Sequence, residues 1–248
     1  MAKKAKLISS AEVVGFTHRG KIRRGHEDAF ILGQHIQPAP APYPIITEVT
    51  VPLDGSMVAV IDGMGGLGGG DIAATWLAER WAPRKVRSAK TLVKQLKQDH
   101  ADLLDLARPT ATPMMGAVAT GAALLPDYAL LFHAGDARAY LVNGTTCTQL
   151  TRDDLDNEGM VLQAFGGGKR LYQETMIEPH TLTLEWREGH ALLLMSDGVW
   201  RYLRPSVISL AYAAVPKLKD FVLALAEIVL DGRADDNITI VAVKWNGS

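Results

Sequence analysis

Acidic side chains recur in this sequence beside turn residues, at either end of short apolar runs. Each of them alone is typical of a turn or a helix cap, because short polar side chains bond readily to nearby backbone. Together they can do chemistry if the fold gathers them at one place. The acids are Glu27 and Asp28 before the run 29–32, Asp62 after 57–61, Asp136 after Gly135, Asp197 before Gly198 and Asp236 before Asn237.

The apolar runs beside these acids predict buried strands, whose ends bring distant segments to one edge of a core. Carboxylates gathered there would repel one another, and the arrangement would be costly unless cations neutralise them. Sites built from oxygen ligands suit hard ions, so the sequence predicts Mg²⁺ or Mn²⁺ rather than zinc. The seven histidines show no spacing typical of a zinc site, which agrees with this choice.

Arg23 stands shortly before Glu27, in the basic turn 21–25 that should face the same edge. A guanidinium beside a metal cluster suits a bidentate phosphate oxyanion. A surface arginine in a basic turn is an equal alternative on local sequence alone. Carboxylates, hard ions and an arginine together describe a metal-assisted phosphoryl hydrolase.

The glycine-rich residues 63–70 leave another hypothesis open. Gly63, Gly65 and Gly68 match the spacing of a dinucleotide-binding turn between a strand and a helix. Against this, the charge of Asp62 opposes a pyrophosphate there, and no strand ending in an acid for the ribose follows the helix. A nucleotide-binding protein is therefore the weaker alternative.

Length and composition favour one soluble domain. We expect a loose tail over 1–10 and a single domain over 11–246, because 248 residues can bury a sizeable core. The formal net charge of −1 gives no field that would attract nucleic acid or an anionic membrane. One cysteine, no signal-peptide pattern and no run long enough to span a bilayer predict a cytoplasmic protein, which we expect to be a monomer.

Apolar periodicity predicts more strands than helices. Helices are expected from Ile72 to about Trp81, over 89–106 and over 218–229, while the four prolines in 37–44 predict an exposed loop. The strands follow one another as meanders with helices in pairs between them, which predicts an α+β fold of antiparallel sheets covered by helices. The expected strands are 11–16, 28–32, 57–61, 116–125, 129–134, 137–143, 146–150, 175–184, 191–195 and 238–243.

Five short stretches containing these acids follow one another along nearly the whole chain. They are Arg23-x-x-His26-Glu27-Asp28, Val60-Ile61-Asp62-Gly63-Met64-Gly65-Gly66, Gly135-Asp136-Ala137-Arg138-Ala139-Tyr140-Leu141, Leu192-Leu193-Leu194-Met195-Ser196-Asp197-Gly198 and Asp236-Asn237-Ile238-Thr239. In this order and spacing they resemble the motifs of the PP2C-type (PPM) protein serine/threonine phosphatases, in their compact bacterial form. Each motif is weak alone, but the five together are a strong signal.

The resemblance implies a fold and a reaction. The fold would be an αββα sandwich, in which two antiparallel β-sheets are flanked by pairs of antiparallel helices. The reaction would be hydrolysis of phosphoserine and phosphothreonine in proteins, with a metal-bridged water attacking phosphorus in line. The cofactor would be Mn²⁺ or Mg²⁺, as two core ions and a third, weaker one. Phosphorylated proteins and a cognate bacterial serine/threonine kinase system are the implied partners.

The resemblance also implies a role for each acid. Asp62 would bridge both core ions, and the Gly63 carbonyl would bind one of them. The remaining implied roles are completion of the first metal site by Asp197 and Asp236, contacts through metal-bound waters by Glu27 and Asp28, the third ion for Asp136 and the substrate phosphate for Arg23.

Departures from the family's pattern bear on function. Met64 stands where animal members carry a histidine proposed as general acid, so a metal-bound water would protonate the leaving group. His26 replaces the usual asparagine, and the flap beside the active site is shortened to 152–161, which would leave the metals more open. A catalytically weak or inactive phosphoprotein-binding module of the same fold is therefore the alternative, although it would not need so many mutually repelling acids.

Overall fold

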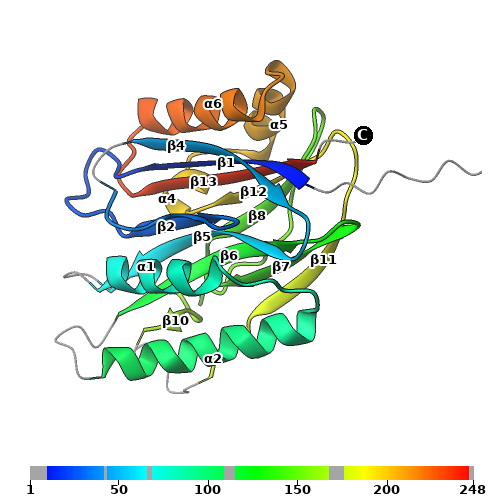
Figure 1. Cartoon of the computed structure of the whole chain (residues 1–248). Coiled ribbons are helices and arrows are strands. Elements are labelled where there is room, and N and C mark those ends of the chain that lie inside the picture. The colour runs from blue at the N-terminus through cyan, green and yellow to red at the C-terminus, as the bar shows by residue number, and fades with distance from the viewer. Residues whose placement is uncertain (1–9, 42–43, 66–68, 109–114, 168–175, 246–248) are drawn as a thin grey trace, which may run out of the picture.

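Two antiparallel sheets lie face to face in the computed structural model, and helices cover the outer face of each sheet (Figure 1). The structure describes residues 10–41, 44–65, 69–108, 115–167 and 176–245. Of the predicted tail 1–10, all but Ser10 lies outside the described residues, and Ser10 is the first residue of strand β1. The predicted α+β sandwich is confirmed.

The first sheet carries the N-terminal and C-terminal strands side by side at its centre. All of its strand pairs are antiparallel. Its six strands, in spatial order, are β4 (Ile45–Pro52), β1 (Ser10–His18), β13 (Ile238–Trp245), β12 (Ala191–Met195), β8 (Arg138–Val142) and β9 (Cys147–Gln149).

The second sheet is also antiparallel throughout. A short strand, β10 (Phe165–Gly166), pairs with β6 outside the main path of this sheet. Along that path the spatial order is β11 (His180–Glu185), β7 (Tyr128–Ala134), β6 (Gly116–Leu124), β5 (Ser56–Met64), β2 (Asp28–Leu32) and β3 (His35–Gln37).

The helices divide between the two outer faces (Figure 1). Those beside the second sheet are α1 (Gly70–Trp81) and α2 (Ala89–Ala107). Those beside the first sheet are α4 (Asp197–Trp200), α5 (Pro205–Ala214) and α6 (Leu218–Asp231). Each sheet therefore buries one face against helices and the other against the opposite sheet, which produces the three large apolar clusters of the described residues.

The helical predictions hold because their apolar stripes are buried. Leu92, Leu96 and Leu103 all lie on the buried face of α2, whose first turn is capped by the Ser88 side chain. Trp81, the last residue of α1, is fully buried and packs edge-to-face on Phe132 and Phe165, two aromatic residues of the second sheet. These contacts bind the helix pair to the sheet that carries Asp62.

Several boundaries differ from those predicted. Strands 28–32 and 191–195 have their predicted bounds, whereas the strand predicted over 175–184 runs from His180 to Glu185, and residue 175 lies outside the described range. The predictions omitted β3, β4, β10, α4 and α5. Of these, β4 is an edge strand with only Val51 buried, so it offered little apolar signal. The strand predicted to end at Ile61 continues to Met64, so Asp62 lies inside β5.

No helix in the described part of the chain is long and apolar enough to cross a membrane.

Candidate functional site

Asp28 and Asp62 lie opposite each other in the second sheet. β2 and β5 pair in a register that makes these two aspartates Cα partners. Side chains directly opposite one another in an antiparallel pair share one face of the sheet and lie close together. Like charges in that relation destabilise the ladder, so this register requires a compensating cation or proton.

The first sheet supplies two further carboxylates, at the ends of two of its inner strands. Asp197 follows β12 as the first residue of α4, and Asp236 precedes β13. β12 and β13 are neighbours, with Met195 paired to Ile240. Because one strand ends where its antiparallel neighbour begins, Asp197 and Asp236 lie at the same end of the sheet.

These acids surround a cavity of about 430 Å³. Every residue predicted to hold metal or phosphate lines it except Asp28, which is almost fully buried. The structure therefore brings together the acids that the sequence scatters between positions 27 and 236. The charged lining residues are Arg23, Arg24, Glu27, Asp62, Asp136, Asp197, Arg201 and Asp236.

Burial and mutual repulsion favour the protonated form of these acids. The pKa of Asp136 is raised to about 6, chiefly by burial and next by the charge of Asp197. Burial, together with the facing Asp28 and Asp197, holds the pKa of Asp62 well above its ordinary value. The pKa values of Glu27, Asp28 and Asp197 are also raised, with burial as the main cause. A cation among these groups would take the place of the protons, since it cancels the repulsion.

Two arginines neutralise part of the negative charge. Arg23 Nη2 donates a hydrogen bond of 2.7 Å to Asp236 Oδ2, while its side chain remains 58% exposed. Arg201 Nη2 lies 2.7 Å from Asp197 Oδ2 and 4.0 Å from Asp136 Oδ2. Sequence reasoning singled out Arg23 but missed Arg201, for which the only signal was its i+4 spacing from Asp197.

Asp28 is held by a buried chain of hydroxyl groups that links the two sheets. Thr239 donates its hydroxyl to Asp28 Oδ2 over 2.6 Å. The Thr17 hydroxyl lies 2.8 Å from that of Thr239 and 2.8 Å from His26 Nε2. Burial lowers the pKa of His26 to about 4, so its ring is neutral and pairs with Thr17 without adding charge. His26 therefore takes a buried, hydrogen-bonded place in the turn before Glu27.

Asn237 fixes the turn that presents Glu27, and sequence reasoning did not assign it a role. Its Oδ1 accepts a hydrogen bond of 2.8 Å from the Glu27 backbone N–H. Its Nδ2 donates to the carbonyl oxygens of Arg19 and Gly25, at 2.8 and 3.1 Å. Its position beside Asp236 was the available signal, but the partners are more than 200 positions away, so only the fold reveals them.

The cavity fits a divalent cation by chemical type. Its donors are carboxylates and backbone carbonyls, the oxygen ligands that hard ions prefer. Gly63 adds backbone to the cavity wall, where a Cβ would overlap carbonyl oxygens of Glu27 and Gly70. Within the described ranges, no three His, Cys, Asp or Glu side chains form a group that could hold a metal ion as they stand. Arg23 and Arg201 pair with two of the acids instead.

Comparison with known proteins identifies relatives of this chain, although no family model matches it. Protein phosphatase PhpP of Streptococcus pneumoniae is 26% identical over 218 residues, which cover 77% of this chain and 86% of PhpP. Serine/threonine protein phosphatase PstP of Mycobacterium tuberculosis is 28% identical over 203 residues, which cover 75% of this chain and 39% of PstP. The solved structure of serine/threonine phosphatase Stp1 from Staphylococcus aureus matches with a TM-score of 0.78 at 20% identity, over 100% of both chains. The chain is thus similar in sequence to bacterial protein phosphatases, and its fold is that of solved bacterial serine/threonine phosphatases.

The flap expected from the resemblance to PP2C-type phosphatases, residues 152–161, is a small hairpin. Leu155 forms a bridge with Val161, and the Asp156 N–H donates to the Met160 carbonyl over 2.9 Å. Gly159 and Val161 line the cavity. The flap was expected to leave the site more open because it is short, yet it still forms part of the cavity wall.

Proposed function

We propose that this chain is a metal-dependent protein phosphatase that hydrolyses phosphoserine and phosphothreonine in proteins. The names of its relatives PhpP and PstP, both protein phosphatases, support the reaction class. The observation that carries the proposal is the gathering of acids from both sheets around one cavity, with Asp28 and Asp62 directly opposed. Repulsion between such closely placed carboxylates is cancelled when a cation binds among them.

The proposed ligands are the cavity carboxylates and one carbonyl, which would hold Mn²⁺ or Mg²⁺ as two core ions and a third, weaker ion. Bound there, the ions would supply an activated water nucleophile and offset the charge that develops on the phosphate. The proposed ligand set is Glu27, Asp28, Asp62, Gly63, Asp136, Asp197 and Asp236.

Arg23 is the proposed phosphate clamp. It lines the cavity, and more than half of its side chain stays exposed although it forms an ion pair with Asp236, so it is accessible to an incoming oxyanion. A guanidinium presents parallel N–H donors, so it orients a phosphate as well as attracting it. Orientation of the phosphate for in-line attack is therefore the expected contribution of this side chain.

The proposal extends to the surroundings of the enzyme. Its substrates would be phosphorylated proteins, with a cognate bacterial serine/threonine kinase system as a further partner. We place the enzyme in the cytoplasm as a monomer.

A phosphoprotein-binding module without catalysis is the second candidate. The observation in its favour is that Arg23 and Arg201 already pair with Asp236 and Asp197. An arginine in that place neutralises the acid without any metal ion. Such a module would bind a phosphopeptide through the same cavity but would show no turnover.

Hydrolysis of p-nitrophenyl phosphate and of a phosphothreonine peptide, with Mn²⁺, Mg²⁺ or EDTA, distinguishes the two candidates. The enzyme should turn over with metal and lose activity in EDTA and in Asp62→Ala. Asp105→Ala is the matched control, because Asp105 is an exposed acid on α2 whose only ion pair among the described residues is with its neighbour Arg108. Peptide binding without turnover, in folded wild-type protein that binds Mn²⁺ by calorimetry, would refute the enzyme and favour the binding module.

A further inference from the structure

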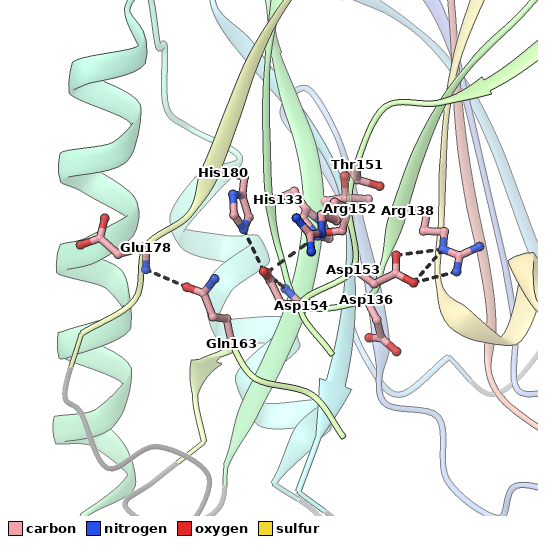
Figure 2. A network of polar contacts seen from close by, with 12 residues as sticks. His133, Asp136, Arg138, Thr151, Arg152, Asp153, Asp154, Gln163, Glu178 and His180 are labelled. Carbon is pink, nitrogen blue, oxygen red and sulfur yellow. Dashed lines mark hydrogen bonds and ion pairs between the residues drawn. The ribbon is translucent and has the colours of Figure 1, made fainter. Parts of the chain in front are cut away.

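The flap segment, residues 152–161, is attached to the rest of the protein by two consecutive aspartates at its base. Figure 2 shows Asp153 and Asp154 pointing to opposite sides, with dashed lines to Arg138 on one side and to His180 on the other. Each aspartate is also connected to the turn formed by Gly135 and Asp136, Asp153 through Arg138 and Asp154 by direct hydrogen bonds. This turn carries one of the carboxylates of the cavity.

Asp153 reaches Asp136 through two intermediate side chains. It forms a forked ion pair with Arg138, in which Arg138 Nε lies 2.9 Å from Asp153 Oδ1 and Nη2 lies 2.7 Å from Oδ2. The Arg138 guanidinium lies over the Trp200 ring, 3.4 Å from its centroid. The Trp200 indole N–H donates to the Asp136 carbonyl over 2.9 Å. The forked geometry fixes the plane of the guanidinium, so it also fixes the ring beneath it.

Asp154 binds the same turn directly. Its Oδ2 accepts a hydrogen bond of 2.9 Å from the Gly135 N–H, and its own N–H donates to the Gly135 carbonyl over 2.8 Å. Its Oδ1 lies 2.8 Å from His180 Nε2, on β11. Gly135 has a φ of +100°, a conformation that other residues rarely adopt, so this turn is strained for any replacement. Asp154 thus ties the flap, the turn and strand β11 together.

The hairpin above these attachments has its own internal bonds. Leu162 N–H donates to the Asp154 carbonyl over 2.7 Å, and Asp156 Oδ1 accepts from the N–H groups of Glu158 and Met160, both at 2.8 Å. The hairpin is therefore built to keep its shape, and its orientation is set at its base. Because Gly159 at its tip lines the cavity, a substitution that loosens the base of the hairpin would also move this part of the cavity wall.

We propose that Asp153 and Asp154 are positioning residues that hold the flap segment and the Asp136 turn together as one wall of the phosphate cavity. This inference rests on the proposed function for its kinetic consequences, but the attachment itself can be measured without turnover. A phosphopeptide extends past the phosphate to the flap, whereas p-nitrophenyl phosphate is small. Loss of this wall should therefore weaken binding of the phosphopeptide more than binding of p-nitrophenyl phosphate.

The test compares Asp153→Asn and Asp154→Asn with Asp156→Asn. The control removes an equal charge from the same hairpin, but among the residues that the structure describes the Asp156 side chain bonds only to the hairpin itself. Both test variants should raise the KM for a phosphothreonine peptide by roughly tenfold, with kcat for p-nitrophenyl phosphate within about twofold of wild type. Amide hydrogen exchange at Asp154 and Leu162 should also accelerate by about tenfold in the test variants, while the control stays near wild type.

The outcomes separate this inference from the proposed function. If wild-type protein shows no turnover, exchange at Asp154 and Leu162 still tests the attachment. Unchanged exchange in both test variants would overturn the inference, and so would faster exchange with an unchanged peptide KM in an active enzyme. Arg138→Lys provides a second variant that keeps the charge but loses the fork, and it should reproduce the effect of Asp153→Asn. Thermal unfolding of each variant confirms that the comparison is made on folded protein.

Discussion

Asp136→Asn should make the metal-free protein more stable while it weakens the proposed metal site. The pKa of Asp136 is raised from its ordinary value of 3.8 to about 6, mainly by burial and by the charge of Asp197. One pKa unit corresponds to about 1.4 kcal/mol, so keeping this carboxylate ionised costs up to about 3 kcal/mol of folding free energy. Asparagine has nearly the same shape and no charge, so it removes that cost.

The sign follows from proton binding. A carboxyl whose pKa is raised in the folded state binds protons more tightly when folded, so folding stability falls as pH rises from 3.8 to about 6 and is constant above. The gain in free energy of unfolding from Asp136→Asn should therefore reach its full value at about pH 7.5 and be roughly half as large at about pH 5. For a chain of this length, 3 kcal/mol corresponds to a rise in Tm of roughly 6–12 °C.

Urea unfolding in EDTA at the two pH values measures this difference, with Asp105→Asn as the exposed control. Added Mn²⁺ should reduce the difference in unfolding free energy between the variant and wild type, because a cation that binds the wild-type acids stabilises the wild-type fold more than the variant. The reasoning would be refuted by a variant that is less stable than wild type in EDTA at about pH 7.5. A difference in stability between the variant and wild type that is the same at both pH values would also refute it.

Two further predictions concern residues outside the cavity. Asp99 is fully buried and accepts hydrogen bonds from Arg80, Arg84 and the Trp81 indole, so Asp99→Ala should cost about 3–5 kcal/mol in urea unfolding; a loss under about 1 kcal/mol would contradict this. Burial raises the pKa of the Cys147 thiol to about 12, so iodoacetamide at pH 8 should react up to roughly a thousandfold more slowly than in urea-unfolded protein. Equal rates in the two states would show that the thiol is not protected.

Local sequence was sufficient for much of the architecture. Apolar runs such as 28–32 and 191–195 form strands with the predicted bounds, because an uninterrupted apolar segment between turn residues has few other ways to be buried. The helix that contains Leu92 and Leu96 followed from its spacing alone. β4 escaped prediction because an edge strand buries little, and its pairing with β1 comes from elsewhere in the chain.

The candidate site shows the same division. The residue types and their places beside turns indicated which acids to examine, since a carboxylate at the end of a buried strand is a local property of the sequence. That Asp28 faces Asp62 depends on the register of two strands, and register is a relation between segments. Asn237 bonding to Glu27 and Arg201 pairing with Asp197 required the fold to be known. The sequence thus determined the chemical groups, and the tertiary structure decided which of them repel, pair and share a cavity.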